Sequence, residues 1–229
     1  MDESDVIAQA RVIYERMQAD LLAASPLAGM AEWVASGVAP PAADLRSRGF
    51  AGPDDTDAPE AANLRLARKA FVREWGFAIP CAEAVAALRR LSPIVEVGAG
   101  AGCWTALLRA AGHDMIATDL AAGDTKYGFA VADRGAVEQL GALEAVRKYP
   151  DRDLFCSWPS EGEPWAAEAI LGLAPGRRAA LILDDRGTLT GDETLRGVLA
   201  QAFRPLETVT IPQFPGVCDR LHIYERLAG

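Results

Sequence analysis

A glycine-rich turn that follows a short apolar strand constrains this chain more than any other feature. The segment PIVEVG (93–98) has the apolar pattern of a buried strand, and a helical segment, GCWTALLRAAG (102–112), comes after the turn. Between them lies Gly98-Ala99-Gly100-Ala101-Gly102. Glycines let the backbone turn tightly here and let a ligand touch it, and the helix beyond begins with free N–H groups. We therefore expect a ligand to bind at the carboxyl end of this strand.

The spacing of the glycines argues against a dinucleotide. The dinucleotide fingerprint is GxGxxG, whose third glycine allows the helix to pack closely on the strand. Counted from Gly98, that third glycine would stand at position 103, where the chain has Cys103. The turn instead reads as an acidic residue, Glu96, followed by GxGxG. The register of the dinucleotide fingerprint therefore fails in this chain.

The second part of the chain, from residue 92 onward, alternates between strands and helices. After the first strand we expect strands at HDMIATD (113–119), RDLFCSW (152–158) and RRAALILDD (177–185), with a short one at 129–133. Helices are expected at 135–148, 164–173 and 192–203. This alternation predicts an α/β fold with a mostly parallel sheet covered by helices on both faces. The last two strands, ETVTIP and DRLHIYERL, are close in sequence and should form an antiparallel hairpin.

The first part of the chain reads as helical. Helices are expected at 4–23, 27–36, 57–76 and 80–91, with a Pro-, Gly- and Asp-rich loop over about 38–58. The first helix has one apolar stripe, which we expect to be buried: Val6, Ala10, Ile13, Met17 and Leu21. We therefore expect a helical cap or lid at 1–90 and a ligand-binding α/β domain at 91–229. The segment REWGFAIP (73–80) should bring Trp75 and Ile79 from the cap to the ligand.

Composition narrows the classes of partner. The formal net charge is −9 and the pI is about 4.8, and the densest basic pairs are only Arg89-Arg90 and Arg177-Arg178, so nucleic acid is not an expected substrate. The MDESD start does not resemble a signal peptide, and no apolar stretch approaches the length of a membrane span. The four cysteines are scattered, which argues against a metal site or a disulfide framework. We expect a cytoplasmic protein with a small-molecule substrate and no metal; the oligomeric state stays open.

Glu96 and the glycine turn resemble motif I of the class I S-adenosylmethionine-dependent methyltransferases. The resemblance implies a Rossmann-like sheet and S-adenosylmethionine as cofactor, with the turn around its methionine part. Asp119, at the end of the second strand, would accept both ribose hydroxyls, since a carboxylate offers two acceptor oxygens. Asp133 would meet the adenine amino group, or is a surface turn residue. Taken together, the cofactor-binding candidates are Trp75, Ile79, Glu96, Gly98, Ala99, Gly100, Gly102, Asp119, Leu120 and Asp133.

Residues of about 70–229 also resemble a little-described group of methyltransferase-like proteins. The likeness rests on REWGFAIP, IVEVGAGAG, a Trp158-Pro159 turn after the fourth strand, and IPQFPGVCDRLHIYER (211–226). Two positions depart from that group: Asp184 replaces a glutamate, and Ser160 replaces an aromatic residue. This likeness points to the fold and the cofactor and leaves the acceptor pocket open. The catalytic candidates are Tyr127, Ser157 and Trp158.

Three functions are compatible with these residues. The first is methyl transfer to a small molecule at nitrogen, sulfur or carbon. The second is cyclisation, in which the cofactor's own amine attacks its Cγ and gives azetidine-2-carboxylate and methylthioadenosine, as in some natural-product pathways. The third is a non-catalytic partner that keeps the fold. Neither His113 nor His222 is expected to act as a base, because both positions suit structural roles, whereas Trp75, Trp104, Tyr127 and Trp165 either line the pocket or belong to the core.

Overall fold

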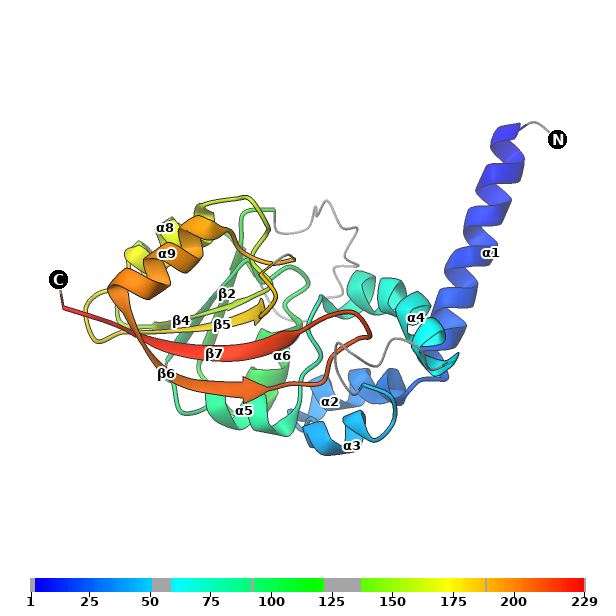
Figure 1. Ribbon diagram of the computed structural model, residues 1–229, viewed down its shortest axis with the longest axis horizontal. Coiled ribbons are helices and arrows are strands. Elements are labelled where there is room, and N and C mark those ends of the chain that lie inside the picture. Colours follow the sequence, from blue (N-terminus) through cyan, green and yellow to red (C-terminus); the bar gives the residue numbers. More distant parts are fainter. Residues whose placement is uncertain (1–2, 51–58, 92, 122–136, 188, 229) are drawn as a thin grey trace.

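The computed structural model describes residues 3–50, 59–91, 93–121, 137–187 and 189–228. The first part is helical, and the second alternates strands with helices (Figure 1). The elements of the first part are α1 (Glu3–Ala23), the 3-10 helix η1 (Pro26–Gly29), α2 (Met30–Ser36), α3 (Ala42–Arg46), α4 (Pro59–Trp75) and α5 (Ala82–Leu88). Those of the second part are β1 (Ile94–Val97), α6 (Cys103–Ala110), β2 (Met115–Asp119), β3 (Val137–Gln139), α7 (Ala142–Lys148), β4 (Asp153–Ser157), α8 (Trp165–Leu171), β5 (Arg178–Asp184), α9 (Glu193–Ala202), β6 (Phe203–Thr210) and β7 (Asp219–Arg226).

The strands form one seven-stranded sheet in the order β3-β2-β1-β4-β5-β7-β6. Neighbours from β3 to β5 pair in parallel, and β7 is antiparallel to both β5 and β6. The edge pairing of β6 with β7 shifts register between Pro205 and Glu207. The predicted sheet, mostly parallel and ending in an antiparallel hairpin, is confirmed.

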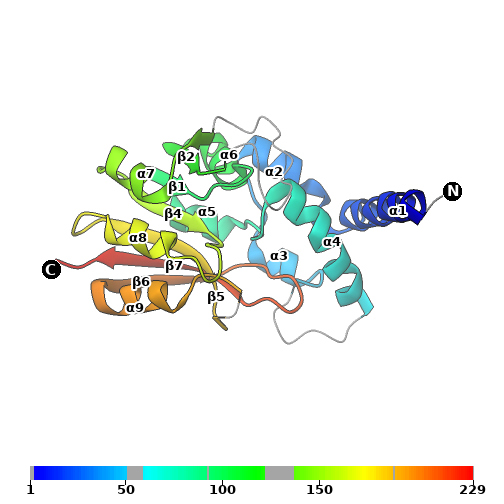
Figure 2. The ribbon, with the colours of Figure 1, turned by 90° about the horizontal axis from the view of Figure 1, so that it is seen from above.

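Side chains of the central strands alternate between two cores, as a strand in a covered sheet must. In β5, Ala179, Leu181 and Leu183 pack on one face with the buried residues of α7, α8 and α9. The residues between them, Ala180 and Ile182, belong to the core of the opposite face. Figure 1 shows α8 and α9 on one side of the sheet and α5 on the other, and Figure 2 views the sheet from the side of α8 and α9. Both faces are therefore covered, as the alternating sequence predicts.

The core of the second face continues into the first part of the chain. It joins residues of α5 and α6 to buried residues of η1, α2, α3 and α4. Phe71 of α4 lies edge-on to Phe214, which precedes β7, with ring centroids 5.3 Å apart. Phe50 makes a similar edge contact with Phe214 at 5.5 Å. Much of the helical first part thus shares one core with the sheet.

Only Leu21 of the apolar stripe of α1 packs against the core, and the rest of the stripe is exposed, which corrects the expectation from its periodicity. The helix extends away from the rest of the molecule (Figure 1) and contacts α4 with its C-terminal half. Gln18 and Leu22 are buried at this contact, whereas Val6, Ile13 and Met17 are 47%, 70% and 40% exposed. The residues that face α4 therefore follow a different stripe from the apolar one. Neither α1 nor any other helix of the described ranges is long and apolar enough to cross a membrane.

Two further expectations need correction. The helix predicted over 135–148 is wrong in its first part, because Val137–Gln139 form β3 beside β2 and α7 starts only at Ala142. The loop predicted over 38–58 contains the short helix α3, whose first amide, on Ala42, donates a 2.8 Å hydrogen bond to Glu83. The short strand predicted at 129–133 lies outside the described residues.

Replacement of Phe71 tests whether α4 and the sheet unfold together. Because the ring is fully buried between α4 and the segment before β7, Phe71→Ala should lower the free energy of unfolding by about 3–5 kcal/mol in a single transition. Urea denaturation followed by circular dichroism measures this. The control Leu206→Ala, at a side chain 42% exposed on β6, should change stability by less than about 0.5 kcal/mol. A separate early transition for the helices would contradict the shared core.

Candidate functional site

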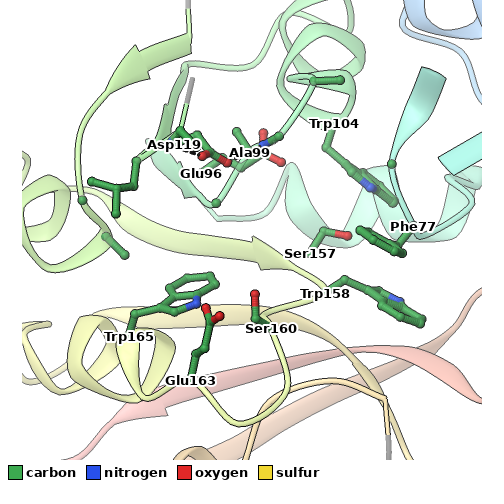
Figure 3. A pocket seen from close by; sticks show the side chains of 18 of the residues that line it. Phe77, Glu96, Ala99, Trp104, Asp119, Ser157, Trp158, Ser160, Glu163 and Trp165 are labelled. Carbon is green, nitrogen blue, oxygen red and sulfur yellow. Dashed lines mark hydrogen bonds between the residues drawn. The ribbon is translucent and has the colours of Figure 1, made fainter. Parts of the chain in front are cut away.

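A cavity of about 480 Å³ opens at the carboxyl ends of β1, β2 and β4 (Figure 3). The chain runs outward from β1 through β2 to β3 on one side and through β4 to β5 on the other, so the strand order switches between β1 and β4. Ligands of open parallel sheets bind in the crevice at such a switch point. The lining residues are Trp75, Gly76, Phe77, Glu96, Gly98, Ala99, Gly100, Ala101, Cys103, Trp104, Asp119, Leu120, Ala121, Gly141, Ala142, Leu143, Glu144, Ser157, Trp158, Ser160, Glu163, Trp165 and Glu168.

The turn after β1 needs its glycines for conformation and for space. Gly98, Gly100 and Gly102 have φ angles of +64°, +54° and +70°, the left-handed region that costs a residue with a side chain about 1–2 kcal/mol. A Cβ at Gly98 would lie only 2.9 Å from the ring of Trp165. Trp165, at the start of α8, therefore packs directly on the turn. The backbone of the turn faces the cavity without side chains in front of it.

The carboxylate of Asp119 connects this turn to the end of β2 by hydrogen bonds. The amide of Gly100 donates to its Oδ2 at 2.8 Å, and the amide of Ala121 donates to its Oδ1 at 2.8 Å. Each carboxylate oxygen still has a lone pair to accept a second hydrogen bond. Because Asp119 lines the cavity, those lone pairs are available to hydroxyl groups of a ligand.

Glu96 is a buried acid at the floor of the cavity. Its side chain is 1% exposed and accepts a hydrogen bond from the hydroxyl of Thr105 in α6. Burial raises its pKa to about 7, and the hydrogen bond from Thr105 opposes that rise only in part. A cation bound in the cavity would stabilise the ionised form. Glu96 therefore suits a positively charged part of a ligand.

Aromatic rings form much of the remaining wall. Trp104, Trp158 and Trp165 line the cavity from the second part of the chain, and Trp75, at the end of α4, and Phe77, just after it, line it from the first. Trp104 is 4% exposed and also lies edge-on to Phe155, so it belongs both to the core and to the cavity. Figure 3 shows Phe77 beside Trp158 on one side and Trp165 with Glu163 on another.

The structure brings most residues expected from the sequence to this cavity and leaves others elsewhere. Those that line it are Trp75, Glu96, Gly98, Ala99, Gly100, Asp119, Leu120, Ser157 and Trp158. Gly102 shapes the turn without lining the cavity, and Ile79 is buried in the core, 1% exposed. Tyr127 and Asp133 lie outside the described residues.

Three stretches of the wall are not predicted from the sequence. One contains Glu163 and Glu168, for which the sequence carries no signal. Another contains Phe77, whose aromatic ring next to Trp75 in REWGFAIP indicates the wall. Gly141–Glu144 were hidden because the sequence predicted a helix through them; the turn between β3 and α7 places them at the cavity.

Neither histidine lines the described part of the cavity. His222 lies on β7, where it contacts Asp185 at 2.7 Å and the hydroxyl of Thr208 at 3.2 Å. His113 precedes β2, at the opposite end of that strand from Asp119. Among the described residues no group of three or more His, Cys, Asp and Glu side chains is arranged to hold a metal ion.

No protein-family model and no curated protein matches this chain, whereas solved structures do resemble it. Magnesium protoporphyrin IX methyltransferase from Synechocystis PCC 6803, with bound S-adenosylmethionine, is 16% identical, covers 80% of this chain and 91% of its own, and has a TM-score of 0.46. A SAM-dependent methyltransferase from Archaeoglobus fulgidus is 14% identical, with 69% and 92% covered and a TM-score of 0.45. N-methyltransferase NodS from Bradyrhizobium japonicum WM9 is 18% identical, with 64% and 96% covered and a TM-score of 0.42.

The strand order identifies the architecture without help from these similarities. Five parallel strands in the order β3-β2-β1-β4-β5, extended by an antiparallel β7 inserted between β5 and β6, match the sheet that the sequence resemblance implies. This chain has the class I methyltransferase fold. At such low identity and TM-score the solved proteins do not indicate what this chain binds.

The glycine turn of this methyltransferase fold can be tested with a matched pair of variants. Gly98→Ala and Gly112→Ala both place a side chain at positive φ, +64° and +82°, but only the first also meets Trp165, because nothing lies within 4 Å at Gly112. Gly112→Ala should cost about 1–2 kcal/mol from backbone strain alone. Gly98→Ala should cost more than that and should weaken ligand binding. If urea denaturation shows the same loss of unfolding free energy in both variants, Trp165 moves aside freely and the close contact at Gly98 has no cost.

Because Glu96 is a buried acid, the stability of the protein should depend on pH. Because the folded-state pKa of Glu96 is about 7, above its ordinary 4.5, folding favours the protonated form. Its favourable contribution is complete below about pH 4.5 and is lost as the pH rises through about 7, a change on the order of 3 kcal/mol. Glu96→Gln mimics the protonated acid, so it should be more stable than the native protein at about pH 8, and the difference should vanish below about pH 4.5.

Urea denaturation across this pH range measures the difference. The control Glu161→Gln, at an exposed residue, should leave the pH profile of stability unchanged. If Glu96→Gln follows the native profile at every pH, the acid is already ionised in the folded protein at neutral pH and the interpretation is wrong.

Proposed function

We propose that this protein is an S-adenosylmethionine-dependent methyltransferase that acts on a small molecule. The observation that carries the proposal is the hydrogen bond between the glycine turn and Asp119. Three left-handed glycines expose backbone at the switch point, and the carboxylate that the Gly100 amide contacts at 2.8 Å faces the same cavity. A nucleoside with two adjacent ribose hydroxyls fits this acceptor pair, and the third glycine of the dinucleotide fingerprint is replaced by Cys103.

The lining residues offer a suitable partner to each part of the cofactor. The glycine turn would surround the methionine part, and Asp119 would accept from the ribose hydroxyls. Leu120 and Leu143 give an apolar surface beside Asp119 on the side of β2 and α7, where an adenine ring would pack. Glu96, in its ionised form, would balance positive charge. When bound, the cofactor supplies an electrophilic methyl group on a sulfonium.

The chain itself contributes orientation and exclusion of water. The rings of Trp75, Trp104 and Trp165 enclose the space next to the turn, and aromatic faces attract a cation. Methyl transfer to a good nucleophile depends mainly on alignment and desolvation, so a histidine base is not needed. Ser157, at the end of β4, is a polar group on the acceptor side of the switch point.

The size of the cavity supports a second candidate, cyclisation of the cofactor. About 480 Å³ lies in the lower half of the roughly 300–1,000 Å³ typical of a pocket that holds one ligand. Such a space suits a small acceptor, or none if the cofactor's own amine is the nucleophile. Product analysis separates the two, because methyl transfer leaves S-adenosylhomocysteine and cyclisation leaves methylthioadenosine. A non-catalytic partner would form neither.

Calorimetric titration with S-adenosylhomocysteine and with NAD tests the cofactor. The native protein should bind the first and not the second. Asp119→Ala should weaken binding by about 1.5–3 kcal/mol, because it removes the acceptor for the ribose hydroxyls. The control Asp114→Ala removes an acid at the other end of the same strand, where Asp114 pairs with Arg152, and should bind normally.

Two outcomes would overturn the assignment. One is NAD binding without any response to S-adenosylhomocysteine. The other is a folded Asp119→Ala variant, verified by circular dichroism, with an unchanged dissociation constant.

A further inference from the structure

Trp158, the first residue after β4, has a strained backbone at the edge of the cavity. Its φ is +61°, and it is the only residue other than glycine in the left-handed region among the described residues. Such a conformation costs about 1–2 kcal/mol and persists only where the surroundings impose it. The Trp158 amide donates to the carbonyl of Ile182 in β5 at 3.1 Å, and the Gly191 amide donates to the carbonyl of Pro159 at 2.9 Å. The main chain is therefore tied on both sides of the strained residue.

The indole of Trp158 is covered by two groups from the first part of the chain. Phe77 stacks on it with ring centroids 4.9 Å apart and an interplanar angle of 7°, as Figure 3 shows. The guanidinium of Arg68, from α4, lies over the indole with its Cζ 5.2 Å from the ring centroid. A cation over a tryptophan face is worth about 0.5–2 kcal/mol, more when it is desolvated.

Arg68 is a half-buried cation that does not itself line the cavity. Its Cζ also lies 6.0 Å from the ring centroid of Phe214, so apolar rings surround it. Burial lowers its pKa, and the charge of Asp219 acts in the opposite direction. Asp219, the first residue of β7, is 3% exposed, and burial raises the pKa of its carboxyl to about 7, although the indole N–H of Trp158 and the guanidinium of Arg68 both lower it. Arg68, Asp219 and the indole thus form one cluster behind the cavity wall.

We propose that Arg68 is a positioning residue, whose guanidinium holds the Trp158 indole against Phe77 as the acceptor-side wall of the cavity. The inference rests on the proposed function, because this wall faces a methyl acceptor only if the protein is a methyltransferase. Trp158 follows β4, on the opposite side of the switch point from Asp119 and β2. The wall that Arg68 positions is therefore separate from the hydrogen bonds that would hold the cofactor. Through Arg68 and Phe77 the first part of the chain determines the shape of the acceptor side.

Fluorine NMR of the protein labelled with 5-fluorotryptophan tests this role without any ligand. The chain has five tryptophans, and Trp158→Phe assigns the resonance of Trp158 by its loss. Arg68→Met removes the charge and keeps a long side chain, so the Trp158 resonance should shift and broaden. Arg68→Lys keeps a cation and should restore part of the native position. Affinity for S-adenosylhomocysteine should fall by less than about tenfold in both variants.

Arg73→Met is the matched control, because Arg73 is on the same helix and its guanidinium faces Glu15 of α1 at 3.7 Å. It should leave the Trp158 resonance in place. An unmoved Trp158 resonance in Arg68→Met, or an equal shift in Arg73→Met, would overturn the positioning role whatever the native protein binds. If Arg68→Met does not fold, Arg68→Lys decides instead. Its Trp158 resonance should lie only part of the way back to the native position. A Trp158 resonance at the native position in Arg68→Lys would then overturn the positioning role. Failure of the proposed function would be seen separately, as absence of S-adenosylhomocysteine binding by the native protein.

Discussion

The hydrogen bond from the Gly100 amide to Asp119 joins the two strand ends on which the site is built. It connects the turn after β1 to the end of β2. On its other side the turn contacts the ring of Trp165, which packs against Gly98. Since the glycines have no side chains to hold them in place, the carboxylate and the packed indole fix the backbone between them. The same carboxylate faces the cavity, so one side chain shapes the turn and also presents acceptor oxygens to a ligand.

The sheet places this joint, and the helices of the first part complete the space in front of it. Parallel β1, β2 and β4 end at one edge, which brings Glu96, Asp119 and Ser157 together. Trp75 and Phe77 reach the cavity because α4 packs in the core of the second face and ends beside it. The cavity is thus made by both parts of the chain, although the glycine turn belongs to the second alone.

Sequence reasoning predicted the features that depend on local pattern. Apolar strands, the glycine turn and the hairpin follow from runs of residues that interact with near neighbours, and they are confirmed. It failed for β3, because Val137–Gln139 are short, polar in part and a strand only by pairing with β2. The prediction that the apolar stripe of α1 is buried was wrong, because α1 contacts α4 through a different stripe, which contains Gln18. The cluster of Arg68, Trp158 and Asp219 joins three distant segments, and no local spacing indicates it.

The register shift in β6 has a consequence for how copies of this protein meet one another. An edge strand with free N–H and C=O groups can pair with the edge of a second sheet. In β6 the chain has Pro205, which lacks an N–H, beside the shift, and flanking charges on Arg204 and Glu207, both in ion pairs. The β6 border of the sheet therefore resists strand-by-strand growth, which protects a mostly parallel sheet from pairing with other copies at this edge.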